Sequence, residues 1–136
     1  MYTYQTKIHL HHTDAAGILF FAHQLELMHD AYEAMFETAG FGFYQMLNHE
    51  EFFLPIVHAE ADYKSPLFVG DLVEIRVSVE SIGSTSFTLS YVLLKPDQSV
   101  VGTGKTVHVS IDKAKRTKIT LPPALREKIR MLAGNG

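Results

Sequence analysis

The sequence predicts an α+β domain in which an antiparallel sheet wraps around one long central helix. Residues 23–39 carry apolar side chains at helical spacing, and four later runs alternate apolar and polar residues as strands do. Turns containing Gly, Pro and Asp separate the last three runs, which favours an antiparallel meander. A lone amphipathic helix beside such a sheet buries its apolar side best when the sheet curves around it.

The N-terminal third is predicted to hold the first strand and the helix. In "YQTKIHLHHT", Ile8, Leu10 and His12 alternate with more polar neighbours, which predicts a strand with one buried face. The helix is expected to end before Gly40, a residue type that suits the position just after a helix. Its expected core side consists of Leu25, Met28, Tyr32, Met35, Phe36 and Ala39.

The later elements follow from local pattern. "FGFYQMLNHEEFFLPI" predicts a short helix and a loop, and "VHAEADYKS" predicts the second strand. The meander strands are predicted in "LVEIRVSVES", "SFTLSYVLL" and "SVVGTGKTVHVSI", the last with Val107, Val109 and Ile111 on one face. "LPPALREKIRMLAG" predicts a C-terminal helix that begins at its two prolines.

Composition limits the possible functions. The 136 residues are 46% hydrophobic and 20% charged, which fits a single domain over residues 1–136. A net charge of −3 argues against a nucleic-acid partner, and the absence of cysteine excludes disulfides, thiol nucleophiles and thiolate metal sites. The sequence shows neither a leader-peptide pattern nor an apolar run long enough to cross a bilayer, so a cytoplasmic protein without a membrane partner is expected.

Asp14 is the first candidate for catalysis. It stands between the first predicted strand and the apolar helix, and the small residues up to Gly17 let the backbone pass close to a bound group. An aspartate in a turn also has an ordinary structural explanation, and that alternative stays open. In the functional interpretation, Asp14 attacks a carbonyl or activates water, while N–H groups at the helix start near Phe21 stabilise the oxyanion.

The histidines of the first third do not favour a metal site. His9 and His11 are expected on the solvent side of the first strand and His12 on the opposite side, so no native metal site is predicted. His58 follows the apolar stretch "LPIV" and is expected in the core, with substrate contact as the alternative.

Two further stretches invite a phosphate ligand. "VVGTGKT" lacks the full phosphate-binding pattern and is followed by a strand, so Gly102 and Gly104 indicate close backbone approach or a bulge. The basic cluster, residues 113–118, is expected to be a solvated surface segment or, alternatively, to hold the phosphates of a nucleotide-bearing ligand.

The stretches "HTDAAGILFF", "HDAYE" and "FFLPIVHAEADYKSPLFVGD" resemble the 4-hydroxybenzoyl-CoA thioesterase family of hot-dog-fold enzymes. Within that family, "LPIVHA" and "HDAYE" are similar to stretches of the 1,4-dihydroxy-2-naphthoyl-CoA hydrolases. The family pattern D-x-D-x-x-G places its second aspartate at Asp14 and its glycine at Gly17, whereas His12 replaces the first aspartate.

The resemblance implies an acyl-CoA thioesterase that needs no cofactor. It implies that Asp14 is the nucleophile or the general base, and that the Phe21 N–H polarises the thioester carbonyl. It also implies a homodimer with active sites between subunits, paired further into a homotetramer. The residues expected to contact the substrate are His23, His58, Tyr63, Lys115, Arg116 and Lys118.

Three functions remain open from the sequence. The first is hydrolysis of an aromatic acyl-CoA, such as 1,4-dihydroxy-2-naphthoyl-CoA, to the free acid and CoA. The second is the same reaction on short or medium aliphatic acyl-CoA. The third is binding of acyl-CoA or an acyl carrier without catalysis.

Overall fold

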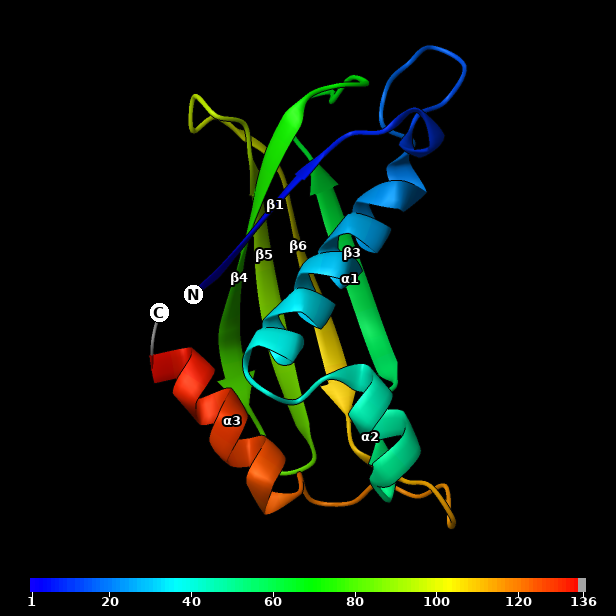
Figure 1. Cartoon of the computed structure of the whole chain (residues 1–136), viewed down its shortest axis with the longest axis vertical. Coiled ribbons are helices and arrows are strands. Elements are labelled where there is room, and N and C mark those ends of the chain that lie inside the picture. The colour runs from blue at the N-terminus through cyan, green and yellow to red at the C-terminus, as the bar shows by residue number, and fades with distance from the viewer. Residues whose placement is uncertain (135–136) are drawn as a thin grey trace.

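One five-stranded antiparallel sheet wraps around α1. The computed structural model describes residues 1–134. The sheet order is β1-β4-β5-β6-β3, and β2 and β7 form a separate two-stranded ladder. Figure 1 shows α1 lying across one face of the sheet, with α2 beyond its C-terminal end. The elements are β1 (Tyr2–Lys7), a 3₁₀ turn η1 (Leu10–His12), α1 (Phe21–Thr38), α2 (Phe43–His49), β2 (Phe52–Phe53), β3 (Ile56–Tyr63), β4 (Leu72–Ile82), β5 (Ser86–Leu94), β6 (Val100–Val109), β7 (Ile111–Asp112) and α3 (Pro123–Gly134).

Most of the predicted elements are confirmed. The strands β4, β5 and β6 form the expected antiparallel meander, and α3 begins at Pro123 and buries Leu125 and Ile129. The predicted loop after α2 contains the short strand β2, which the sequence analysis missed because two residues carry no periodicity. None of the helices within residues 1–134 is long and apolar enough to span a bilayer.

The first strand is shorter than predicted. β1 ends at Lys7, which pairs with Leu72, the first residue of β4. Ile8 still bonds the turn before β4, since its N–H donates to the Asp71 carbonyl and its carbonyl accepts the Gly70 N–H. The chain turns away at Gly70, whose φ is +90°, so the residues after Ile8 have no neighbouring strand. The predicted strand residues 10–12 form a 3₁₀ turn instead, and Leu10 is 74% exposed rather than buried.

The core side of α1 is close to the predicted one. Its buried residues are Gln24, Leu27, Met28, Ala31, Tyr32, Met35 and Phe36. Leu25 was expected in the core but is 36% exposed. The polar residue before it, Gln24, is buried instead. Gly40 follows the helix at φ +82° and donates its N–H to the carbonyl of Glu37, as expected of a helix-ending glycine.

Two glycines let α1 pack closely on β6. A Cβ at Gly102 would lie 2.7 Å from Gln24 Nε2, and one at Gly104 would lie 2.6 Å from Met28 Sδ. Close backbone approach, one of the two predicted explanations for these glycines, is therefore confirmed. The side of β6 that faces α1 carries Gly102, Gly104, Thr106 and His108, all buried. Val107 and Val109 share the opposite face, as predicted, and of the two only Val109 is buried.

Candidate functional site

Asp14 lies in an exposed turn that orients its carboxylate. Its Oδ1 accepts the N–H of Ala16 at 2.9 Å and the N–H of Ile18 at 3.3 Å. Gly17, at φ +76°, donates its N–H to the Asp14 carbonyl at 3.0 Å. Oδ2 makes no hydrogen bond within residues 1–134. The turn therefore fixes the side chain through one oxygen and leaves the other to meet a ligand or water.

The start of α1 has no side-chain cap. The N-cap residue is Phe20, which has no acceptor on its side chain, and the first turn holds no acidic residue. The Phe20 N–H donates to the His12 carbonyl at 3.0 Å, but the Phe21 N–H has no partner among the described residues. Most helices satisfy these donors with Ser, Thr, Asp or Asn. Here the Phe21 N–H remains free to bond an oxygen that gains negative charge, and it lies at the positive end of the helix dipole.

A hollow of about 340 Å³ lies beside this helix start. Its lining includes Ile18 from the Asp14 turn, Phe21 from α1, and Tyr63 and Lys64 from the end of β3. Tyr63 Oη donates to the Phe21 carbonyl at 2.7 Å and so ties the end of β3 to α1. The structure thus brings together the predicted residues Phe21 and Tyr63 next to the turn that carries Asp14.

His23 anchors the helix to the preceding turn. Its Nδ1 lies 2.9 Å from the His12 carbonyl, and because a carbonyl can only accept, Nδ1 carries the proton. Its Nε2 lies 3.9 Å from a Glu26 carboxylate oxygen. The predicted contact of His23 with substrate stays untested, while this bond gives it a positioning role. His12 itself is buried, and burial together with the nearby histidines lowers its pKa below the ordinary value.

His58 lies on the surface, so the prediction of a core histidine is wrong. Its ring is exposed on β3, and Nε2 lies 3.1 Å from Glu60 Oε1. The apolar stretch before it is misleading because β3 is an edge strand, exposed at most positions from Ile56 to Tyr63. Contact with substrate at this position stays a prediction.

The basic cluster lies at the far end of the molecule from the start of α1. Lys113 Nζ donates to the carbonyl of Leu47 in α2 at 2.6 Å, and the Arg116 guanidinium lies 5.4 Å from the centre of the Phe53 ring. Lys115, Arg116 and Lys118 follow β7, which pairs with β2. Figure 1 shows this orange segment at the same end of the molecule as α2. Within one chain, the structure does not bring them to Asp14.

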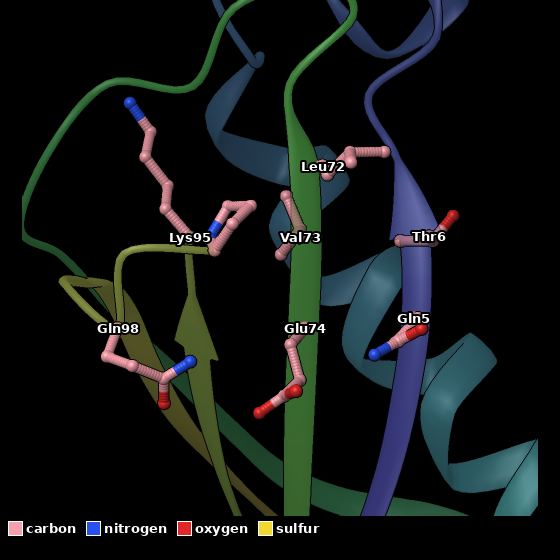
Figure 2. A pocket seen from close by; sticks show the side chains of 8 residues that line it. Gln5, Thr6, Leu72, Val73, Glu74, Lys95 and Gln98 are labelled. Atoms are coloured by element: carbon pink, nitrogen blue, oxygen red, sulfur yellow. The ribbon is translucent and has the colours of Figure 1, made fainter.

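Another hollow, of about 350 Å³, lies away from these groups, between β1, β4 and the turn after β5. Figure 2 shows Gln5 and Thr6 on one side of it, Leu72 to Glu74 in the middle, and Lys95 and Gln98 on the other side. Its charged side chains already have partners, since Arg76 bonds Glu74 as well as Gln98, and Lys95 lies 3.7 Å from Asp71. We therefore assign no chemistry to it.

A buried chain of polar groups, which the sequence did not predict, lies under the middle of α1. Thr106 Oγ1 lies 2.8 Å from Tyr91 Oη and 2.7 Å from His108 Nε2. The His108 ring stacks on Phe87 and contacts Tyr32, while His108 Nδ1 and Tyr32 Oη have no partner among the described residues. Burial lowers the pKa of His108 to about 3 and raises the pKa of Tyr91 to about 12. His108 is therefore a neutral core group.

Gln24 and Lys64 were also missed. Gln24 is buried and donates through Nε2 to the carbonyls of Asp62 and Thr103, which fixes the first turns of α1 against β3 and β6. The signal that could have found it is its place four residues before Met28 on the buried side of the helix. Lys64 supplies a cation at the hollow, and its position next to Tyr63 was the only available hint.

Comparison with known proteins identifies the family. The chain matches the Thioesterase-like superfamily over residues 8–129. A 1,4-dihydroxy-2-naphthoyl-CoA hydrolase of Rippkaea orientalis is 36% identical over 129 residues, which covers 93% of this chain and 94% of the relative.

Solved structures agree with this result. A 1,4-dihydroxy-2-naphthoyl-CoA thioesterase from Synechocystis superposes with a TM-score of 0.90 at 26% identity, covering 96% of each chain. A gentisyl-coenzyme A thioesterase superposes with a TM-score of 0.84, also at 26% identity, covering 93% of this chain and 98% of that one. The narrower label of a 4-hydroxybenzoyl-CoA thioesterase family stays a prediction. With its sheet wrapped around α1 and its match over nearly the whole length, this chain belongs to the hot-dog-fold Thioesterase-like superfamily.

Proposed function

We propose that this protein hydrolyses an aromatic acyl-CoA, of the class of 1,4-dihydroxy-2-naphthoyl-CoA, to the free acid and CoA. The observation that carries the proposal is the uncapped start of α1, which borders a hollow beside the turn of Asp14. The names of the relatives support an aromatic acyl group. The aromatic side chains of Phe21 and Tyr63 at the hollow are suited to a flat ring system.

The chemistry requires few groups because a thioester carbonyl is more readily attacked than that of an oxygen ester. The carbonyl oxygen accepts the Phe21 N–H, which stabilises the charge that develops on it. In one route, Asp14 Oδ2 attacks the carbonyl carbon, CoA leaves as a thiolate, and water hydrolyses the mixed anhydride. In the other, Asp14 takes a proton from an attacking water and passes it to the departing sulfur.

The free edge of β3 supports a homodimer. β3 ends the sheet, its outer edge has no partner strand within residues 1–134, and Val57 on it is 59% exposed. A long unpaired edge of this kind favours pairing with a second copy. An antiparallel pairing about a two-fold axis places the start of the partner's β3 beside Tyr63. Further pairing into a homotetramer remains part of the proposal.

Such a dimer also gives the basic cluster a role. The cluster follows β7, which pairs with β2 just before β3, so it lies near the start of β3. In the antiparallel dimer it approaches the active end of the partner. We therefore assign Lys115, Arg116 and Lys118 to the CoA phosphates of the site in the other subunit, where charge-assisted bonds are favourable.

The activity is tested by measuring thiol release from a panel of aromatic and aliphatic acyl-CoA thioesters. We expect the highest kcat/KM with a fused or hydroxylated aromatic acyl group, and a loss of activity in Asp14→Ala and Asp14→Asn. A higher kcat/KM with short or medium aliphatic thioesters would select the second function. Calorimetric binding of acyl-CoA without turnover would select the binding protein.

The subunit arrangement is tested with mixed dimers. One chain carries Asp14→Ala, and the other carries the triple change Lys115→Ala, Arg116→Ala and Lys118→Ala. If the cluster serves the partner's site, each mixed dimer contains one intact site, and activity at low substrate rises well above that of either parent. Activity that stays at the average of the two parents would show that both groups act within one chain.

A further inference from the structure

His9, His11 and His12 form a cluster that the proposed reaction does not use. One ring nitrogen from each residue lies within 4.8 Å of the others. The rings of His9 and His11 stack with centroids 5.4 Å apart, and the centroids of His11 and His12 are 4.2 Å apart. In the part of the chain that the structure describes, no other histidine, cysteine or acidic group of three meets this spacing.

The 3₁₀ turn brings these rings together. In a strand, His12 would point away from His9 and His11, and the sequence argument against a metal site depended on that geometry. In a 3₁₀ turn, residues three apart lie one above the other, so His9 and His12 fall on the same side. The structure therefore removes the objection that the predicted strand raised.

We propose that His9, His11 and His12 bind one divalent transition-metal ion, such as Zn²⁺, Ni²⁺ or Cu²⁺, with water in the remaining coordination positions. A set of three imidazoles suits these ions, whereas Mg²⁺ and Ca²⁺ prefer oxygen ligands. Three histidines with an open position are also a common zinc ligand set.

Small side-chain rotations are enough to form the site. Zinc–nitrogen bonds of roughly 2.0–2.1 Å put two ligating nitrogens about 3.3 Å apart in a tetrahedral site. The side chains of His9 and His11 are exposed and free to rotate, while the buried His12 provides a fixed point. Closing the cluster therefore requires no movement of the core.

One hydrogen bond competes with the ion. His12 Nδ1 accepts the N–H of His9 at 3.0 Å, so the neutral ring carries its proton on Nε2. The ion must take the place of this bond at Nδ1, or bind Nε2 after the ring proton has moved to Nδ1, which also breaks the bond. We therefore expect a dissociation constant on the order of micromolar, weaker than that of a preformed structural zinc site.

The bound ion would restrict the motion of residues 9–12, the segment just before Asp14. The His12 carbonyl accepts hydrogen bonds from both the Phe20 N–H and His23 Nδ1. An ion bound to the His12 ring therefore also restrains the start of α1. Because the ion binds the folded arrangement of three rings better than the unfolded chain, it should raise the melting temperature. This expectation does not depend on the proposed reaction.

The test uses the full chain without an affinity tag, stripped of metal with a chelator. Zn²⁺ and Ni²⁺ are titrated by calorimetry, and Co²⁺ is added to follow the visible absorption that reports coordination. We expect one ion per chain, a higher melting temperature with Zn²⁺, and at least a 30-fold weaker affinity in the double variant His9→Ala/His11→Ala.

The matched control is His49→Ala, which removes an exposed histidine at the other end of the molecule and should bind as the unchanged chain does. Because His9 and His11 are exposed, circular dichroism and melting without metal should show that the double variant folds normally. Absence of binding at about millimolar Zn²⁺ and Ni²⁺, or equal affinity in the double variant and the unchanged chain, overturns the proposal.

Discussion

At the start of α1, the Phe21 N–H and one oxygen of Asp14 have no hydrogen-bond partner among the described residues. Around the middle of the same helix, the buried side chains of Tyr91, Thr106 and His108 form a chain of hydrogen bonds. The exposed groups can remain unpaired because water or a ligand can reach them. In the core, where Tyr32 Oη and His108 Nδ1 already lack partners among the described residues, each further unpaired group costs free energy. One helix therefore serves a reactive end and a structural middle, and the two should respond differently to mutation.

The largest expected effect is at the reactive end. Asp14→Asn should lower kcat/KM by about 10³-fold, since the amide neither attacks a carbonyl nor accepts a proton from water. The melting temperature should change little, because the amide oxygen can still accept the N–H groups of Ala16 and Ile18. Thiol release and thermal melting measure the two quantities. Retained activity in this variant contradicts the role given to Asp14.

The matching change in the structural middle is Thr106→Val. It removes the hydroxyl shared by Tyr91 and His108 and leaves both buried groups unpaired, which should lower the free energy of unfolding by about 2–3 kcal/mol. Thr106→Ser keeps the hydroxyl and is the control, with a smaller loss from the missing methyl group. Urea denaturation of the three proteins measures the difference. Equal stability of the valine and serine variants would show that the hydroxyl contributes nothing.

Acid should weaken the structural middle through His108. Its pKa of about 3 in the folded chain lies below the ordinary value of 6.5, so the unfolded state binds the proton first as the pH falls. The contribution of neutral His108 to the free energy of unfolding is therefore fully present above pH 6.5, and it is lost progressively as the pH falls from 6.5 toward 3. Between pH 7 and pH 5, the free energy of unfolding should fall by about 2 kcal/mol because of His108 alone.

The contribution of His108 is isolated by comparing the unchanged chain with His108→Gln. Denaturation at pH 7 and at pH 5 should show a loss about 2 kcal/mol greater in the unchanged chain, because the variant lacks the titrating ring. Equal losses in both proteins would mean that other groups govern the acid sensitivity.

The smallest expected effect is at Tyr63, the residue at the end of β3 that bonds the start of α1. Tyr63→Phe removes the bond to the Phe21 carbonyl at an exposed site, and this loosens the first turn of α1 by about 1 kcal/mol or less. We expect kcat to fall by a few-fold, with little change in melting temperature. Tyr44→Phe, which alters an exposed tyrosine on α2, is the control and should leave kcat unchanged. A loss of kcat equal in both variants would remove Tyr63 from the site.

The sequence predicted the elements best where the pattern is local. The amphipathic side of α1 and the turns of the meander depend on residues within a few positions of each other, and both predictions hold. The predictions failed where a distant neighbour decides. The alternation of Ile8, Leu10 and His12 suggests a strand, but the strand stops at Lys7 because β4 offers no further residues to pair with.

The site shows the same division. Asp14 and Gly17 could be chosen from sequence because their turn is formed by neighbouring residues, although their catalytic role stays a proposal. His58 could not be placed correctly, because its exposure follows from β3 being the edge of the sheet. The hydrogen-bonded chain of Tyr91, Thr106 and His108 could not be predicted from the sequence. It depends on the strand register, which places Thr106 opposite Leu89 and turns His108 toward α1.

The sequence by itself determined α1, the strands and turns of the meander, and which carboxylate stands before the apolar helix. Only the tertiary structure decided which face of β6 is buried, that Tyr63 reaches the start of α1, and that His9, His11 and His12 share one turn. The physical reason is that periodicity and turn chemistry act between neighbours along the chain. Burial, register and the availability of a partner strand depend on residues far apart in sequence, and no local pattern encodes them.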